Sequence, residues 1–258
     1  MAIMNLSEDS FFEHYTRKTD KSLLNHAEQL ILNGANIIDI GAVSTRPEAP
    51  NISSSDEIKK IGSTISLLKK TFPSVLISAD TFSEKTINFV IDEGADIIND
   101  ISGGAITESC ISHISQHKLG YILTYNRGGK KNNVLTHQLD SIISDALLFF
   151  SEKLQIFTKN NLIDIILDPG FGFNKSLEDN FKLLKESENL KILERPILYG
   201  LSRKSMIYKT LNISVEEALN GTTILNTFAA CKGANILRVH DVAEARQLKT
   251  LLSSLKSN

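Results

Sequence analysis

The feature that most limits the fold of this chain is an alternation of two kinds of segment, repeated eight times. Short, almost wholly apolar runs alternate with longer stretches, such as 140–160, in which apolar residues recur at helical spacing. Parallel strands that are covered on both faces have this apolar character, so the pattern predicts an α/β protein with the (β/α)8 TIM-barrel fold. An open doubly wound sheet is the alternative. The expected strands are Ala2–Leu6, Asn36–Gly41, Val75–Asp80, Asp96–Asn99, Gly120–Tyr125, Ile163–Asp168, Pro196–Gly200 and Asn235–Val239.

Three of the expected helix–strand joints share a pattern, Gly-Ala followed by Asn or Asp, beginning at Gly34, Gly94 and Gly233. Glycine ends a helix readily because it adopts the left-handed conformation without a steric penalty, so we expect a helix to end at each of these sites. The chain has 258 residues and shows no linker, low-complexity segment or further repeat. We therefore expect a single domain over residues 1–258.

The composition excludes several classes of protein. The formal net charge of -2 gives no reason to expect nucleic acid or an anionic membrane as a partner. Cys110 and Cys231 are the only cysteines, too few for a disulfide framework or a cysteine-based zinc site, and we expect both to be buried as small apolar residues. No apolar stretch approaches the roughly 20 residues that span a bilayer. These features indicate a cytoplasmic protein.

Polar residues collect where the predicted strands end. In a barrel of this kind the active site lies at the carboxyl ends of the strands, so these side chains should meet at one mouth. Buried polar groups are costly unless paired, which favours a functional reason for their presence. They are Asn5, Ser44, Thr45, Arg46, Pro47, Asp80, Thr81, Asn99, Asp100, Asp168, Ser202, Arg203, Lys204, Ser205, Arg238 and His240.

Each of these residues also has a purely structural interpretation. Asp80 or Asp168 could cap the helix that follows its strand, and Lys204 could be a solvated lysine in a first helical turn. His240 could likewise begin the last helix, and the glycines near Phe173 could permit a tight loop. We prefer the functional interpretation because of the whole set, since a site would be absent only if every one of these residues had a purely structural role.

The residue types at the mouth indicate what could bind there. Asp80, Asn99 and Asp168 around a lysine suit a planar amino-pyrimidinone, because a carboxylate can accept from its ring N–H and its amino group at once. Lys204 could donate to the ring carbonyl. A second group (Arg238, His240, Arg46 and the oxygen ligand Asn5) suits a phosphate with Mg²⁺. The start of the helix after the seventh strand could hold a carboxylate. The mouth is predicted to take a phosphorylated heterocycle and a small acid.

Seven segments, in order along almost the whole chain, resemble the strand-end motifs of the dihydropteroate synthase family. They read MAIMNLSEDSFF, IIDIGAVSTRP, ISADT, GADIINDISGG, IILDPGFGF, LYGLSRKS and NILRVHD. The resemblance implies an enzyme that condenses 6-hydroxymethyl-7,8-dihydropterin pyrophosphate with 4-aminobenzoate, in the presence of Mg²⁺, to give 7,8-dihydropteroate and pyrophosphate.

The resemblance also implies roles for individual residues. It places Asp80, Asn99, Asp168 and Lys204 around the pterin, with Phe173 and Gly200 as walls. Arg238 would stack on the pterin and hold the pyrophosphate together with His240, while Asn5 would ligate Mg²⁺. The aminobenzoate site would be shaped by Phe11, Thr45, Arg46, Pro47, Ser202 and Ser205.

The chain departs from the family pattern at three places. Thr124-Tyr125-Asn126 stand where a Met-His-Met type of run is usual, which changes one wall of the pterin pocket. The loop Ser7–Glu13 lacks the usual proline and glycines, and Ala42-Val43 replace the usual Gly-Glu. Two alternatives stay open. A pterin-binding methyltransferase would not need the Ser-Thr-Arg-Pro loop, Lys204 at its place, or Arg238 and His240 for pyrophosphate. The altered run after the fifth strand and the altered first loop leave open a non-catalytic pterin-binding relative.

The expected partners are the two small-molecule substrates, with no nucleic acid and no membrane. A homodimer is compatible with the sequence. The first predicted strand begins at Ala2, where the family usually has a hairpin that covers the bottom of the barrel. We therefore expect the natural polypeptide to extend upstream of Met1, either by that hairpin or by a fused folate-pathway domain.

Overall fold

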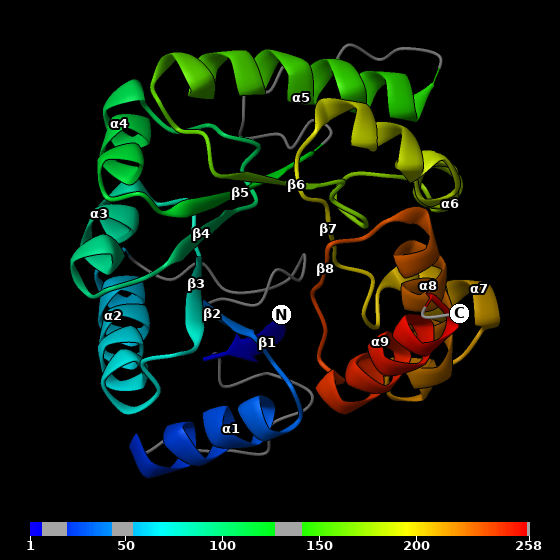
Figure 1. Ribbon diagram of the computed structural model, residues 1–258, viewed down its shortest axis with the longest axis horizontal. Helices are drawn as coiled ribbons and strands as arrows, with labels where there is room; N and C mark the ends of the chain where they lie inside the picture. The colour runs from blue at the N-terminus through cyan, green and yellow to red at the C-terminus, as the bar shows by residue number, and fades with distance from the viewer. Residues whose placement is uncertain (7–19, 43–53, 127–140, 257–258) are drawn as a thin grey trace.

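The computed structural model describes residues 1–6, 20–42, 54–126 and 141–256, and its helices lie around a central ring of strands (Figure 1). All eight expected strands are present, each within three residues of its predicted bounds. The elements are β1 (Ala2–Asn5), α1 (Asp20–Leu32), β2 (Ile37–Gly41), α2 (Ser54–Thr71), β3 (Leu76–Asp80), α3 (Glu84–Asp92), β4 (Ile97–Asp100), α4 (Glu108–Gln116), β5 (Gly120–Thr124), α5 (Ile142–Lys159), β6 (Ile165–Asp168), α6 (Leu177–Glu186), η1 (Ser187–Leu193), β7 (Leu198–Tyr199), α7 (Ser205–Leu211), η2 (Glu216–Ala218), α8 (Leu219–Lys232), β8 (Ile236–Leu237) and α9 (Val242–Lys256).

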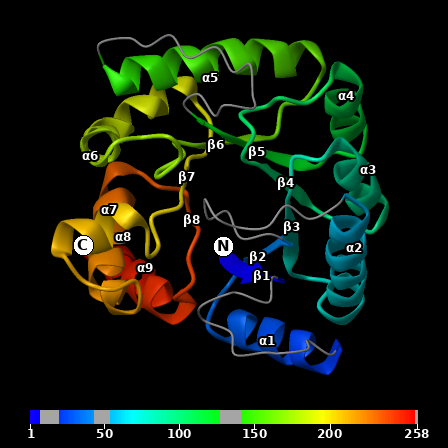
Figure 2. The ribbon, with the colours of Figure 1, turned by 180° about the vertical axis from the view of Figure 1, so that it is seen from behind.

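The strands close into a barrel. β1 to β6 form one parallel sheet in chain order, and β7 pairs with β8 in parallel. Single parallel bridges, Leu167 with Ile197 and Ala2 with Val239, join these two sheets at both edges. Views from the front and from behind both show the helices outside this ring (Figure 1, Figure 2). The TIM-barrel prediction is therefore confirmed, and the open doubly wound sheet is excluded by the bridge between Ala2 in the first strand and Val239, two residues after the last strand.

The interior of the barrel contains a small apolar layer beneath the mouth. Ile37, Ile97, Ile122 and Leu198, from four different strands, pack together there, with Met1, Ile166 and Ile236 against them. Side chains alternate across a strand, so the residues two positions further along face inward as well, one layer nearer the carboxyl ends. Those residues are Asp39, Asn99, Thr124, Gly200, Asp168 and Arg238. The alternation thus places a polar layer directly on top of an apolar one.

The three repeated glycines adopt the conformation expected of them. Gly34, Gly94 and Gly233 have φ of 106°, 91° and 104°, and each lies between a helix and the strand that follows. The expectation for the cysteines is half wrong. Cys110 is buried, but Cys231 is exposed, because its position on α8 faces solvent rather than the strands. Among the described helices, none is long and apolar enough to cross a membrane.

Candidate active site

Asp39 on β2 is the hub of the polar layer. Its side chain is fully buried and accepts three hydrogen bonds, from side chains on β3, on β4 and just after β8. The Arg238 guanidinium donates from Nε at 2.6 Å and the Asn99 amide from Nδ2 at 3.0 Å, both to Oδ2. The Ser78 hydroxyl donates to Oδ1 at 2.6 Å. A buried carboxylate is costly without such partners. With them, Asp39 fixes the positions of Arg238, Asn99 and Ser78.

Arg238, which directly follows β8, also forms an ion pair with Asp80, from Nη2 to Oδ2 at 2.7 Å. Burial raises the pKa of the Asp80 carboxyl to about 7, against the attraction of Arg238, and the nearby carboxylate of Asp39 adds to the increase. Burial alone would lower the pKa of the Arg238 guanidinium, but Asp39 and Asp80 raise it above its ordinary value. Arg238 therefore stays positively charged, whereas the Asp80 carboxyl is close to half-protonated at neutral pH.

Asn99 on β4 is oriented by this network. Its Nδ2 donates to Asp39, so its Oδ1 points elsewhere. That oxygen is buried and has no hydrogen-bond partner within the described part of the chain. Such an atom is costly unless a ligand donates to it, since buried acceptors in native proteins are almost always satisfied. Asn99 therefore offers an acceptor to a bound molecule.

Lys204 and Asp168 form the opposite side of the layer. The Lys204 ammonium donates to the Phe171 carbonyl and lies 5.1 Å from the ring centre of Phe173. Burial lowers the pKa of Lys204 to about 8, against the charge of Asp168. Burial likewise raises the pKa of Asp168, against the charge of Lys204. The interpretation of Lys204 as a solvated surface lysine is therefore wrong, because its side chain turns inward across Gly172 instead of into solvent.

The loop after β7 holds His240 in place. The Ser202 hydroxyl and His240 Nδ1 are 3.0 Å apart, and the His240 amide donates to the same hydroxyl at 3.3 Å. Arg203, in a left-handed conformation with φ of 53°, forms a two-pronged ion pair with Asp241 at 2.9 and 2.8 Å. Two neighbouring residues of the loop after β7, Ser202 and Arg203, thus bind two neighbouring residues after β8, His240 and Asp241. These bonds hold Ser202 against His240.

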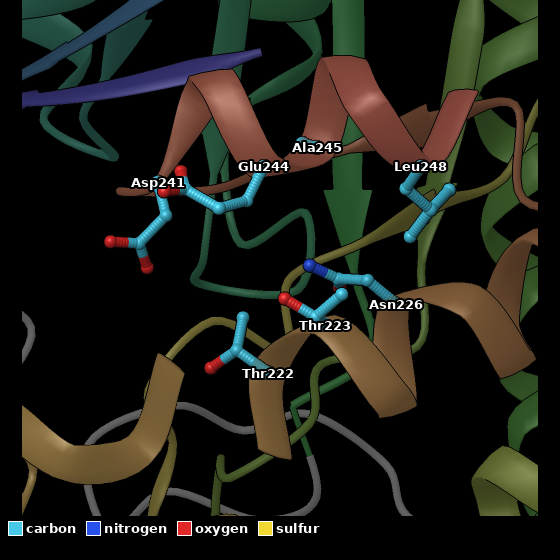
Figure 3. Close-up of a pocket in the computed structure, with 7 residues that line it drawn as sticks. All are labelled: Thr222, Thr223, Asn226, Asp241, Glu244, Ala245 and Leu248. Atoms are coloured by element: carbon cyan, nitrogen blue, oxygen red, sulfur yellow. The ribbon is translucent and has the colours of Figure 1, made fainter. Parts of the chain in front are cut away.

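A shallow hollow, with no enclosed space for a water molecule, lies behind this loop, where α8 faces the start of α9 (Figure 3). Asp241, which binds Arg203, and Thr222, whose hydroxyl accepts from the Arg203 amide, are on its wall. The inward-facing carboxylates of the barrel are not among its lining residues. Its lining is Thr222, Thr223, Asn226, Asp241, Glu244, Ala245 and Leu248. The hollow therefore lies beside the residues that support the loop after β7, and it lies outside the polar layer.

The ends of β4, β5 and β6 are tied by local hydrogen bonds. Asp100 accepts from the Tyr121 hydroxyl and from the amides of Ser102 and Gly104, the latter two at 2.6 and 3.2 Å. Asn126 donates to the Ile101 carbonyl at 3.0 Å. Asp100 is thus a turn anchor, and the altered sequence after β5 joins the neighbouring loop.

The structure brings most of the predicted site residues to one end of the barrel. Asp80, Asn99, Asp168, Lys204, Arg238, Phe173 and Gly200 belong to the polar layer or its rim, with Ser202 and His240 paired beside it. Asn5 ends β1 on the inward face, and Ser205 is the first residue of α7. Phe11, Thr45, Arg46 and Pro47 lie outside the described residues.

Sequence reasoning missed Asp39, the centre of the network. A signal for it existed, because an acid interrupts the apolar run Ile37–Ile40 in the middle of a strand expected to be buried. A charge in such a position is costly unless it is paired, so it should have indicated a buried cationic partner.

The chain matches the family model described as pterin binding enzyme over residues 1–240. The dihydropteroate synthase of Streptococcus pyogenes serotype M3 is 34% identical to it over 262 residues, which cover 99% of this chain and 94% of the relative. The dihydropteroate synthase of Escherichia coli K12 is 33% identical over 247 residues, which cover 95% of this chain and 86% of the relative.

Solved structures agree. The dihydropteroate synthase of Yersinia pestis in complex with a sulfonamide drug has a TM-score of 0.89 and 31% identity, covering 99% of this chain and 93% of that one. That of Xanthomonas albilineans with 4-aminobenzoic acid has a TM-score of 0.90 and 28% identity, covering 100% and 92%. The match of family model, full-length relatives and fold shows that this chain belongs to the pterin-binding enzymes, and among them to the dihydropteroate synthase family.

Proposed function

We propose that the protein condenses 6-hydroxymethyl-7,8-dihydropterin pyrophosphate with 4-aminobenzoate to give 7,8-dihydropteroate and pyrophosphate. The observation that carries the proposal is that hydrogen-bond acceptors and a cationic donor lie together in the polar layer at the barrel mouth. Asn99 Oδ1 is buried without a partner in the described chain, the Asp168 carboxylate is buried in the same layer two strands away, and Lys204 lies beside Asp168. A 2-amino-4-oxopyrimidine ring has the complementary edge.

In this proposal the chain's own residues first orient the pterin. Asp168 accepts from the ring N–H and the amino group, Asn99 Oδ1 accepts from a further N–H, and Lys204 donates to the ring carbonyl. The Lys204 ammonium now bonded to the Phe171 carbonyl exchanges that partner for the pterin oxygen. Phe173 covers the ring beside it. Burial of these groups in a layer with little water strengthens each interaction.

The bond between the exocyclic methylene carbon and the bridging oxygen then breaks, and its electron pair leaves with pyrophosphate. The electron-rich dihydropterin delocalises the resulting cation, which the Asp80 carboxylate stabilises. Two of the five N–H donors of Arg238 bond Asp39 and Asp80, and the guanidinium supports the leaving group together with His240. The neutral amine of aminobenzoate attacks the carbon and loses a proton. Ser202 and Ser205, with Phe11, Thr45, Arg46 and Pro47, shape the site for this second substrate.

The described residues of the site would need the phosphate oxygens of the substrate to complete a Mg²⁺ site. Among the described residues no group of three or more His, Cys, Asp or Glu could hold a metal. Asn5 presents a hard amide oxygen on the inward face of β1, and Mg²⁺ is commonly bound by one or two protein oxygens together with phosphate oxygens and water. Asn5 would thus hold the ion against the pyrophosphate, where the ion would neutralise charge on the leaving group.

The same proposal includes a cytoplasmic location and inhibition by sulfonamides. The unpaired cysteines support a reducing compartment. The sulfonamide complex of the Yersinia pestis enzyme, 31% identical over nearly the full length, supports the last point.

A pyrophosphate-release assay with both substrates tests the proposal. Release should require the dihydropterin pyrophosphate and 4-aminobenzoate together, and a sulfonamide should compete with the latter. Omission of Mg²⁺, with chelator present, should reduce the rate. Pterin binding without any turnover would overturn the catalytic proposal and support a non-catalytic binding protein instead.

A further inference from the structure

Thr124, the last residue of β5, occupies the inward row between two residues of the site. Its register partner on β6 is Asp168, and β4 on the other side carries Asn99. The Thr124 side chain is fully buried, and its Oγ1 has no hydrogen-bond partner among the residues that the structure describes. It shares that state with Asn99 Oδ1 in the same layer, so two unsatisfied polar atoms lie on adjacent strands.

The direction of the side chain follows from the strand. Ile122, two residues earlier, packs inside the barrel against Ile97, so Thr124 faces the interior one layer higher. The methyl group of Thr124 lies toward the loop after β6, because a Cβ built on Gly170 would come within 3.0 Å of its Cγ2. With the methyl group on that side, the hydroxyl takes a different staggered position on the same buried carbon.

A buried hydroxyl without a partner lowers stability, and native proteins keep such groups rarely. A valine would fill the same space without that cost. The hydroxyl is therefore explained most simply by a polar ligand that enters this layer and satisfies it.

We propose that Thr124 is a specificity-determining residue whose hydroxyl hydrogen-bonds to the amino-pyrimidinone edge of the bound heterocycle, beside Asp168 and Asn99. The inference rests on the proposed function, since it assumes a heterocycle in this layer. The 2-amino group has two hydrogens, and a single carboxylate oxygen takes only one of them. Thr124 Oγ1, next to Asp168 in register, accepts the second. Ligands that lack this amino group leave the hydroxyl unsatisfied and bind less tightly.

The test compares Thr124→Val, which removes the hydroxyl at constant shape, with Thr124→Ser, which keeps it. The matched control is Thr64→Val on α2, because Thr64 is also buried but its hydroxyl already donates to the Lys60 carbonyl at 2.8 Å. The probes are 6-hydroxymethylpterin and the same ring without its 2-amino group, with affinity measured by calorimetry and stability by urea unfolding.

Thr124→Val should weaken binding of the amino-bearing pterin at least about fivefold, the lower end of what an unpaired hydrogen-bonding group costs. Its stability should be unchanged or higher than that of wild type, and its preference for the amino-bearing probe should shrink. Thr124→Ser and Thr64→Val should bind like wild type.

Two kinds of failure are distinguishable. If the wild-type protein does not bind 6-hydroxymethylpterin, the proposed function itself is wrong. If wild type binds and Thr124→Val binds equally well, or loses stability without losing affinity, the hydroxyl has a structural role and this inference is overturned. Equal weakening in the Val and Ser variants would also overturn it, since packing would then be the cause.

Discussion

The Arg238 guanidinium donates from Nε to the carboxylate of Asp39 at 2.6 Å, although the two residues are 199 positions apart in the chain. Asp39 comes from the second strand and Arg238 follows the last, so this bond spans the seam where the barrel closes. The same carboxylate also fixes the Asn99 amide. One buried acid therefore sets the position of a cation and the direction of a neighbouring acceptor in the site.

Replacing Asp39 should damage both stability and activity. In Asp39→Ala, Arg238 would retain only Asp80, and removing one partner of a buried pair typically costs about 3 kcal/mol or more. Asp39→Asn keeps an oxygen for the same donors, so it should lose less. Urea unfolding and pyrophosphate release measure the two effects. Asp164→Ala, at an exposed acid just before β6, is the control and should match wild type. Equal stability of Asp39→Ala and wild type would contradict the role of Asp39 as the hub.

Replacing Asp168 should weaken pterin binding and spare the fold. Burial already disfavours the charged form of Asp168, so alanine removes a desolvated group from the empty protein. A bound pterin would instead lose a charged acceptor, which is worth at least about 1.5 kcal/mol, or roughly tenfold in affinity. Calorimetry with a folded Asp168→Ala variant measures this loss. An unchanged affinity would remove Asp168 from the pterin site.

The stability of the protein should contain a pH-dependent contribution from Asp80. Burial raises the pKa of this carboxyl from 3.8 to about 7 in the folded state. The folded protein therefore holds the proton more tightly than the unfolded chain, so this contribution is fully present below pH 3.8 and is lost as pH rises toward 7.

Asp80→Asn should remove that contribution while still accepting from Arg238. The free energy of unfolding of the variant, relative to wild type, should therefore increase as the pH rises through this window. Urea unfolding of both proteins at several pH values measures the difference, in which the titrating groups remote from Asp80 cancel. A constant difference, or one that decreases with pH, would mean that the pKa of Asp80 is not raised.

Two glycines of the loop after β6 should respond very differently to alanine. Both Gly170 and Gly172 have positive φ, 66° and 85°, so alanine strains the backbone at either position. At Gly170 the new Cβ would also collide with the Tyr125 carbonyl oxygen, whereas at Gly172 its nearest neighbour is Lys204 Cδ at 3.5 Å. We expect Gly172→Ala to cost about 1 kcal/mol and Gly170→Ala at least about 3 kcal/mol in thermal or urea unfolding. Similar costs for both would show that the loop can move away from Tyr125.

Much of the architecture followed from local sequence. The apolar runs that became β2 to β6 and the glycines at positions 34, 94 and 233 carry information that acts within a few residues, through periodicity and backbone conformation. The rule that parallel strands end at one face then located Asp80, Asn99, Asp168 and Arg238 correctly at the mouth. These predictions needed only local residue patterns and the order of the elements along the chain.

The pairing of those residues needed the closed barrel. Asp39 could not be matched with Arg238 from the sequence, because their contact depends on the last strand returning beside the first. The inward turn of Lys204 depends on its bond to the Phe171 carbonyl, and the unsatisfied state of Thr124 and Asn99 depends on what surrounds them in three dimensions. Periodicity and turn chemistry act along the chain and were readable in advance, whereas hydrogen-bond partners and desolvation are decided by neighbours that only the folded barrel brings together.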